Sequence, residues 1–354
     1  MRRICLLAEP AFAILERLGA NESLRVGGEQ FPYYLPDITS VEACRQALSD
    51  ATASEGVRVE LLSLADQESV IQALGMIGSD TVFWPLTDGY LPFVGTPLIG
   101  LLRSFGAHVF GSGPMAAAVS QNKLLQFGLF RALGLATPQT WLYSNDLPPP
   151  DHGGSFIAKP VDLGNSIGIF DDGIDCDWRS ALSAAQRIRE WYGREAIIQE
   201  YISGTYCRAT FLGSGPAKGK RIGVHIMSHE AGEPPPPLAA RNFGAYFAEF
   251  KRRDEGYNGG VTVQSLDAAV REGRVSVAAQ ERVSADLGKL AAHTDLAGVF
   301  SLDLIIAGDT PYFIEVNTNP FIRNRAFASF CEEEFGADVV TSLYRVLAEF
   351  LDGV

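Results

Sequence analysis

Acidic and amide side chains occupy regular positions in two apolar segments near the end of this 354-residue chain. Asp303 lies inside the run VFSLDLII, and Glu315 and Asn317 lie in the run FIEVNTNP. Residues two apart in a strand point to the same face, so Glu315 and Asn317 would project together. If the two segments pair, all three side chains converge. Such a set offers only oxygen ligands, which suits Mg²⁺ bridging nucleotide phosphates. The alternative is two buried carboxylates that are each neutralised by a lysine or arginine.

A lysine followed by a glycine-rich turn forms a second candidate site. Lys159 interrupts the apolar run FIAKPV, and the segment GNSIG follows it. A buried ammonium group needs an anionic or polar partner, and backbone N–H groups in such a turn can surround phosphate oxygens. The alternative is an ordinary hairpin turn whose lysine extends toward solvent.

Other polar residues give weaker signals. Lys123 and Lys251 could each be a solvated surface lysine. His225 and His229 lie four apart in VHIMSHE, as in some metal sites. The alternation around them predicts a strand, and neither an HExxH motif nor a third ligand accompanies them, so zinc is not the expected occupant.

The elements that must position these residues can be read in part from hydrophobic periodicity. In the first third, strand-like runs at 4–8, 57–64 and 81–86 alternate with helical patterns at 40–52 and 98–106. This order predicts an α/β lobe with a parallel sheet and right-handed crossovers. No GxGxxG motif follows the first strand, so the dinucleotide-binding fingerprint is missing.

The remaining two thirds predict a mixture of strands and helices. Ser112 is expected to cap a helix that ends before Gly134. The segment FIAKPVDLGNSIGIF is expected to form a strand, a turn and a second strand, and REAIIQEYISG another strand. Helices are expected at 277–293 and in the C-terminal ADVVTSLYRVLAEFLDGV.

Composition limits the classes of partner. Hydrophobic residues make up 47% of the chain, which suggests two or three lobes. The net charge is −13 and no basic stripe is present, so nucleic acid is not an expected partner. Five scattered cysteines without a CxxC pair predict a reducing cytoplasm. The first apolar run is too short for a signal peptide, and none approaches the roughly 20 residues that span a bilayer.

The order of these motifs resembles that of the ATP-grasp ligases, in particular the D-alanine–D-alanine ligase-like branch. The motifs GSGPMAAAVSQNK, LGLATPQTW, FIAKPVDLGNSIGI, IIQEYISG, SLDLII and FIEVNTNP follow one another in the family's order across roughly residues 80–325. The resemblance implies an ATP-grasp fold with an N-terminal parallel-sheet lobe at 1–112. It implies two α+β lobes at 113–203 and 204–354 that clamp the nucleotide.

The resemblance also implies a reaction. A carboxylate attacks the γ-phosphate of ATP to give an acyl phosphate and ADP, and an amine then displaces phosphate to form an amide. ATP and two Mg²⁺ ions are the implied cofactors, with Mn²⁺ as an alternative metal. The implied residues for the nucleotide are Lys123, Lys159, Asn165, Ser166, Gln199, Glu200, Ile202 and Lys251, and those for the metal are Asp303, Glu315 and Asn317.

The chain departs from the family pattern on the substrate side. Ser301 stands where the family has an arginine two residues before the metal-binding aspartate, and Phe321 replaces a glycine that helps form an oxyanion hole. Ala326 replaces a serine that binds the acceptor carboxylate, and Tyr206 replaces a ribose-binding acid. The segment WPLTDGY occupies the place of the family's HG turn. We therefore expect small-molecule substrates other than two D-alanines.

A new arginine is expected to compensate for the one missing at Ser301. Arg323 or Arg325 could bind an acceptor carboxylate or the acyl-phosphate oxygens through a bidentate fork. The alternative is that both pair on the surface with the acids at 332–334. The expected catalytic residues are therefore Arg323, Arg325, Lys251 and Ser301.

A proline-rich stretch precedes Lys251 and predicts either a lid over the nucleotide or a surface linker. A strict D-alanine–D-alanine ligase and a non-catalytic nucleotide-binding protein remain the alternative functions. A homodimer is the expected assembly.

Overall fold

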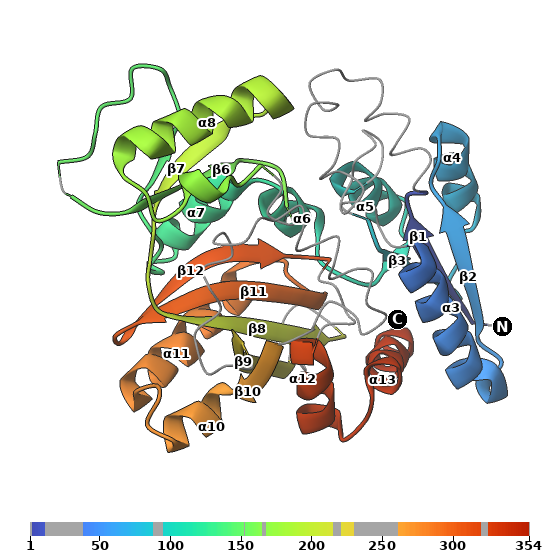
Figure 1. Cartoon of the computed structure of the whole chain (residues 1–354). Coiled ribbons are helices and arrows are strands. Elements are labelled where there is room, and N and C mark those ends of the chain that lie inside the picture. The colour runs from blue at the N-terminus through green and yellow to red at the C-terminus, as the bar shows by residue number, and fades with distance from the viewer. Residues whose placement is uncertain are drawn as a thin grey trace.

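The computed structural model describes residues 2–10, 38–87, 95–151, 153–164, 168–214, 221–229, 261–319 and 325–353. Its strands form three sheets, which lie in the N-terminal, central and C-terminal parts of the chain (Figure 1). This mixture of one parallel sheet with antiparallel sheets confirms the expected α/β class. No described helix combines the length and the apolar character needed to cross a membrane.

The N-terminal sheet is parallel, with the strand order β2-β1-β3-β4. Its strands are β1 (Arg3–Ala8), β2 (Arg58–Ser63), β3 (Thr81–Pro85) and β4 (His108–Val109). The helices between them are α3 (Ile38–Thr52), α4 (Gln67–Gly75) and α5 (Thr96–Ser104), and η2 (Ala53–Glu55) follows α3. The predicted alternation of strand and helix is confirmed.

Helices cover both faces of this sheet because side chains alternate along each strand. Cys5 and Leu7 pack with the residues of α4 and α5. Ile4 and Leu6 pack on the opposite face, in a core that includes α3 and the C-terminal helix α13 (Val339–Asp352). The last helix of the chain therefore packs against the first sheet, across the lobe boundary expected from sequence.

The central part contains a small antiparallel sheet of order β5-β7-β6. Its strands are β5 (Thr140–Leu142), β6 (Phe156–Pro160) and β7 (Ala196–Glu200). The associated helices are α6 (Pro114–Ser120), α7 (Lys123–Ala132), α8 (Trp178–Tyr192) and the short η3 (Asp171–Gly173). Phe156, Ala158 and Ile198 pack against α8, which covers one face of the sheet (Figure 1). By alternation, Lys159 of β6 points to the opposite face.

Three expectations about this region differ from the structure. Ser112 does not cap the helix; Gly113 is the N-cap, and the Ser112 hydroxyl donates to the Ala297 carbonyl at 3.2 Å. The single helix expected up to Gly134 is interrupted between α6 and α7, because the Lys123 N–H turns away to the Val161 carbonyl. The second strand expected after the glycine-rich turn is also absent from the described residues 168–173, which end in η3.

The C-terminal sheet is antiparallel, with the order β10-β9-β8-β11-β12. Its strands are β8 (Thr205–Gly213), β9 (Arg221–His229), β10 (Val261–Ser265), β11 (Gly298–Ala307) and β12 (Thr310–Asn317). The helices of this region are α10 (Leu266–Arg271), α11 (Val277–His293) and α12 (Arg325–Phe335). Phe300, Leu302 and Leu304 share a core with residues of α10 and α11. By alternation, Ser301 and Asp303 point to the opposite face.

Strand β12 forms one edge of this sheet, and the central part of the chain covers that edge. The Phe313 N–H donates to the Ala136 carbonyl at 2.8 Å, and the Val316 N–H donates to Gln126 Oε1 at 2.9 Å. A strand edge buried without such partners would leave polar groups unsatisfied. These bonds hold α7 beside β12 and so bring the two candidate sites together.

Candidate active site

A row of charged side chains crosses strands β8, β11 and β12. Asp303 lies opposite Glu315 in the β11–β12 register, and Ser301 lies opposite Asn317. The predicted pairing of the two segments is confirmed. Arg208 lies opposite Asp303 on the other side, in β8. The row therefore presents two carboxylates and one amide on a single face of the sheet.

Each carboxylate in this row has a basic partner. Arg208 pairs with Asp303, with Nε 2.8 Å from Oδ1. Lys123 pairs with Glu315, with Nζ 3.3 Å from Oε1. The sequence analysis gave such neutralisation by basic residues as the alternative to a metal site. An ionised carboxylate has about four lone-pair sites, so Asp303 and Glu315 can also accept a hard cation beside their basic partners.

Lys123 is buried rather than solvated. It is the first residue of α7, and Asn122 caps that helix by accepting from the Leu125 N–H at 3.1 Å. Lys123 Nζ donates to the Leu163 carbonyl at 2.6 Å, and its side chain is 9% exposed. The ammonium group thus joins the segment after β6 to Glu315 of β12, at the junction of the central and C-terminal parts.

Lys159 lies in a polar row that crosses the central sheet on the face away from α8. Its Nζ donates to Gln199 Oε1 at 2.9 Å, and Gln199 Nε2 donates to Thr140 Oγ1 at 2.9 Å. Burial lowers the pKa of Lys159 to about 8, while nearby Glu315 and Asp303 oppose this shift and Lys123 reinforces it. The charges of Glu315 and Asp303 therefore act on Lys159, although its hydrogen-bond partner is the neutral amide of Gln199.

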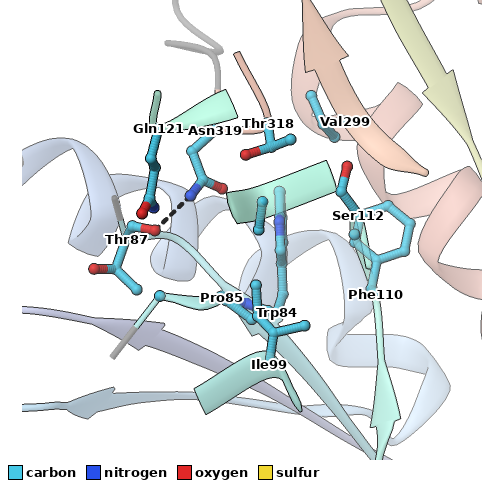
Figure 2. A pocket seen from close by; sticks show the side chains of 13 residues that line it. Trp84, Pro85, Thr87, Ile99, Phe110, Ser112, Gln121, Val299, Thr318 and Asn319 are labelled. Carbon is cyan, nitrogen blue, oxygen red and sulfur yellow. Dashed lines mark hydrogen bonds between the residues drawn. The ribbon is translucent and has the colours of Figure 1, made fainter. Parts of the chain in front are cut away.

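The structure contains a pocket that sequence reasoning missed. Figure 2 shows it between the carboxyl ends of β3 and β4 and the turn after β12, with Trp84, Phe110, Thr318 and Asn319 among its lining residues. Asn319 Nδ2 donates to the Thr87 carbonyl at 2.6 Å. The signal was available, because ligands of open parallel sheets bind beyond the carboxyl ends of the strands.

A buried carboxylate adjoins this pocket. Glu9 follows β1 and is fully buried, and the Thr87 hydroxyl donates to its Oε2. Because Thr87 also accepts from Asn319, a short polar chain connects the N-terminal sheet with the turn that follows Asn317. The pocket thus lies where the N-terminal sheet meets the end of β12.

Sequence comparison finds similar proteins over part of the chain. No protein-family model matches the chain. A D-alanine–D-alanine ligase of Anaeromyxobacter dehalogenans strain 2CP-C is 29% identical over 231 residues, covering 62% of this chain and 64% of that protein. The match therefore spans slightly less than two thirds of that relative's length.

Solved structures extend the similarity to the whole fold. The D-alanyl-alanine synthetase A of Vibrio cholerae gives a TM-score of 0.65 at 14% identity, with 99% of both chains covered. A D-alanine–D-alanine ligase of Bacillus anthracis complexed with ATP gives a TM-score of 0.59 at 16% identity, covering 100% of this chain and 98% of that one. The chain therefore shares its fold with these ligases and is similar in sequence to D-alanine–D-alanine ligases over part of its length.

The other predicted residues of the described chain lie in or beside the central and C-terminal sheets. Gln199 and Glu200 belong to β7 and Ile202 follows it, and the Glu200 carboxylate accepts from the Gln139 N–H at 3.0 Å. Ser301 is buried on the face that carries Asp303. Contacts of these residues with adenine or substrate remain predictions.

The predicted arginines and phosphate-loop residues are described only in part. Arg325 is the exposed first residue of α12. The acids Glu333 and Glu334, which the sequence offered as its partners, contact His225 and Arg221 respectively. Four further predicted site residues lie outside the described residues, namely Asn165, Ser166, Lys251 and Arg323, as do Phe321 and the proline-rich stretch.

His225 has a structural explanation. Its side chain is buried, and Nε2 lies 3.2 Å from Glu333 Oε2, so it connects β9 to α12. Burial lowers the pKa of His225, and Glu333 opposes the shift. Within the described part of the chain, no three His, Cys, Asp or Glu side chains gather as a metal site would require. That zinc does not bind at His225 and His229 remains an expectation from the sequence.

Proposed function

We propose that this chain is an ATP-dependent ligase that joins a carboxylate to an amine through an acyl phosphate. The observation that carries the proposal is the meeting of Lys123 and Lys159 from the central part with Asp303 and Glu315 from the C-terminal sheet. Buried cations beside acidic oxygen ligands suit a metal-bound polyphosphate, whose charge must be offset in a site that excludes water.

The proposed nucleotide site uses residues of both parts. Lys123 and Lys159 bind phosphate oxygens, and the segment that contains Asn165 and Ser166 covers them. Gln199, Glu200 and Ile202 meet the base. Lys251 approaches the γ-phosphate.

The oxygen set fits a divalent cation. Asp303 and Glu315 are cross-strand neighbours on one face, and Asn317 follows two residues later. Bound there, Mg²⁺ would offset the negative charge of the phosphates. The number of ions and the use of Mn²⁺ belong to this proposal.

The proposed chemistry has two balanced steps. A carboxylate oxygen attacks the γ-phosphorus, and the bond from phosphorus to the bridging oxygen breaks, so ADP leaves. The amine nitrogen then attacks the acyl carbon and loses a proton, and phosphate leaves with the oxygen that the carboxylate supplied. The protein's lysines hold the phosphates in line and stabilise the charge that moves between them.

The substrates are proposed to differ from two D-alanines. The relatives and structural neighbours carry the names of D-alanine–D-alanine ligases, so strict ligation of D-alanine is the second candidate. Against it stand Ser301 in place of an arginine and the neutral lining of the pocket in Figure 2, where Trp84, Phe110 and Asn319 lie. We propose an amino acid or a related acid as the carboxylate.

A labelled phosphate-release screen tests the proposal. Pools of amino acids and other carboxylates are supplied with ATP and Mg²⁺, and active acids are resynthesised with ¹⁸O in both carboxylate oxygens. We expect ADP formation to depend on the acid, with one ¹⁸O transferred to phosphate. Glu315→Gln should abolish the transfer. Phosphate without label would exclude the acyl phosphate, and no stimulation by any acid would favour a non-catalytic nucleotide-binding protein. Stimulation by D-alanine alone would favour the strict ligase.

A further inference from the structure

Arg208 is a charged residue that belongs to neither the nucleotide-binding set nor the metal-binding set. It lies opposite Asp303 in the antiparallel register of β8 and β11. Its Nε donates to Asp303 Oδ1 at 2.8 Å, and a terminal nitrogen donates to Asp303 Oδ2 at 3.2 Å. The guanidinium therefore contacts both carboxylate oxygens, which is the two-point geometry that distinguishes arginine from lysine.

The surroundings of this pair are polar but sheltered. The side chains of Arg208 and Asp303 are 17% and 20% exposed. The same terminal nitrogen of Arg208 also donates to the Tyr206 hydroxyl at 3.2 Å. Burial raises the pKa of Tyr206 well above its ordinary value, so the phenol stays neutral and adds no charge to the pair. Arg208 is thus the cation that directly neutralises Asp303.

The charges along the row follow the order cation, anion, anion, cation. Arg208 pairs with Asp303, Asp303 lies opposite Glu315, and Glu315 pairs with Lys123. A divalent ion between the two carboxylates would add positive charge next to Arg208. Like charges that contact the same carboxylate repel each other, so the ion and the guanidinium would compete for Asp303. A guanidinium displaced from one anion is stabilised by another, and phosphate offers matching paired oxygens.

On the basis of the proposed function, we propose that Arg208 exchanges partners when metal and nucleotide bind. It holds Asp303 in the nucleotide-free protein and binds phosphate oxygens in the metal–nucleotide complex. The exchange makes and breaks hydrogen bonds without covalent change or proton transfer. Arg208 would then place a guanidinium at the phosphates, whereas the sequence predicted one at Arg323 or Arg325 for an acceptor carboxylate or the acyl-phosphate oxygens. Arg208 reaches the site from β8.

Two binding measurements on the full chain test the exchange, because they must change in opposite directions. The first is the affinity of the nucleotide-free protein for Mn²⁺, followed by the electron paramagnetic resonance signal of the free ion. We expect Arg208→Met to bind Mn²⁺ about tenfold more tightly, since Asp303 loses its competing cation. The second is the affinity for a nonhydrolysable ATP analogue at saturating Mn²⁺. We expect Arg208→Met to weaken it by at least about tenfold, since a charged hydrogen bond to phosphate is lost.

Two further variants complete the experiment. Arg208→Lys keeps the charge but loses the fork, so its Mn²⁺ affinity should stay within about twofold of wild type while analogue binding weakens. Arg221→Met is the matched control. Arg221 is also a strand residue of this sheet, and its ion pair with Glu349, at 3.2 Å, lies outside the site. Both affinities should be unchanged in this control.

The possible outcomes separate the inference from the function on which it rests. If wild type binds both ligands but Arg208→Met binds Mn²⁺ more weakly, Arg208 merely orients Asp303 and the exchange is overturned. Unchanged analogue binding in Arg208→Met or Arg208→Lys overturns it as well. If Arg208→Met does not fold, as judged by its melting curve, the analogue affinity of Arg208→Lys decides. A wild type that binds neither Mn²⁺ nor the analogue overturns the proposed function, and the inference with it.

Discussion

Nucleotide affinity should depend on pH through Lys159. Burial lowers the pKa of this ammonium from 10.5 to about 8. A phosphate binds the protonated form, so nucleotide binding should raise the pKa again and draw protons from solution. The protonated fraction falls from about 90% at pH 7 to about 10% at pH 9 for a pKa near 8. The Kd of an ATP analogue with Mg²⁺ should therefore rise about tenfold between these two pH values.

The same shift predicts how stability changes without nucleotide. Between about pH 8 and pH 10.5, the unfolded chain holds a proton on Lys159 that the folded chain has released. The free energy of unfolding therefore rises with pH across this window. Below about pH 8, the charged buried Lys159 lowers the free energy of unfolding by roughly 3 kcal/mol relative to a fully exposed lysine.

Titration calorimetry in two buffers of different ionisation enthalpy measures both the Kd and the proton uptake. At pH 8 we expect uptake of about half a proton per analogue bound, since about half of the Lys159 side chains are neutral there. Lys159→Arg should remove the uptake and the pH dependence, because a guanidinium stays charged throughout. Lys289→Met, which changes an exposed lysine paired with Asp286 at 2.8 Å, should behave as wild type. Equal Kd values at pH 7 and pH 9, with no proton uptake by wild type, would refute the reasoning.

Three further predictions concern stability. A nonhydrolysable ATP analogue at about one hundred times its Kd, with Mg²⁺, should raise the free energy of unfolding by about 3 kcal/mol, whereas no change in melting temperature would speak against a nucleotide site. Gly298→Ala should cost roughly 2–5 kcal/mol in urea unfolding, because φ is +69° and the added Cβ would lie 2.5 Å from the Gly111 Cα. Gly308→Ala, at φ +59° but in open space, should cost only about 1 kcal/mol, and equal losses would contradict the role of the close contact. Gln126→Leu should lower the free energy of unfolding by about 1–3 kcal/mol, because the buried Val316 N–H loses its acceptor. The control Gln186→Leu, on the exposed face of α8, should change it by less than about 0.5 kcal/mol. An equal effect of the two substitutions would count against the contact between Gln126 and β12.

The sequence alone predicted much of the local structure. The periodicity that indicated a helix at 277–293 matches α11, and the alternating runs in the first third match the parallel sheet. The spacing of Glu315 and Asn317 correctly predicted their shared face and their convergence with Asp303. These features depend on the repeat of one element, which a single stretch of sequence contains.

The partners of the site residues were decided by tertiary structure. Lys123 could not be distinguished from a surface lysine, because its burial depends on Leu163 and Glu315, which follow it by 40 and 192 positions. The capping role expected of Ser112 failed for the same reason, since its hydroxyl bonds to a distant carbonyl. Local pattern shows which way a side chain faces, whereas the strand order determines what it meets there. The pairing of Arg208 with Asp303 exists because β8 lies next to β11, although β9 and β10 come between them in sequence.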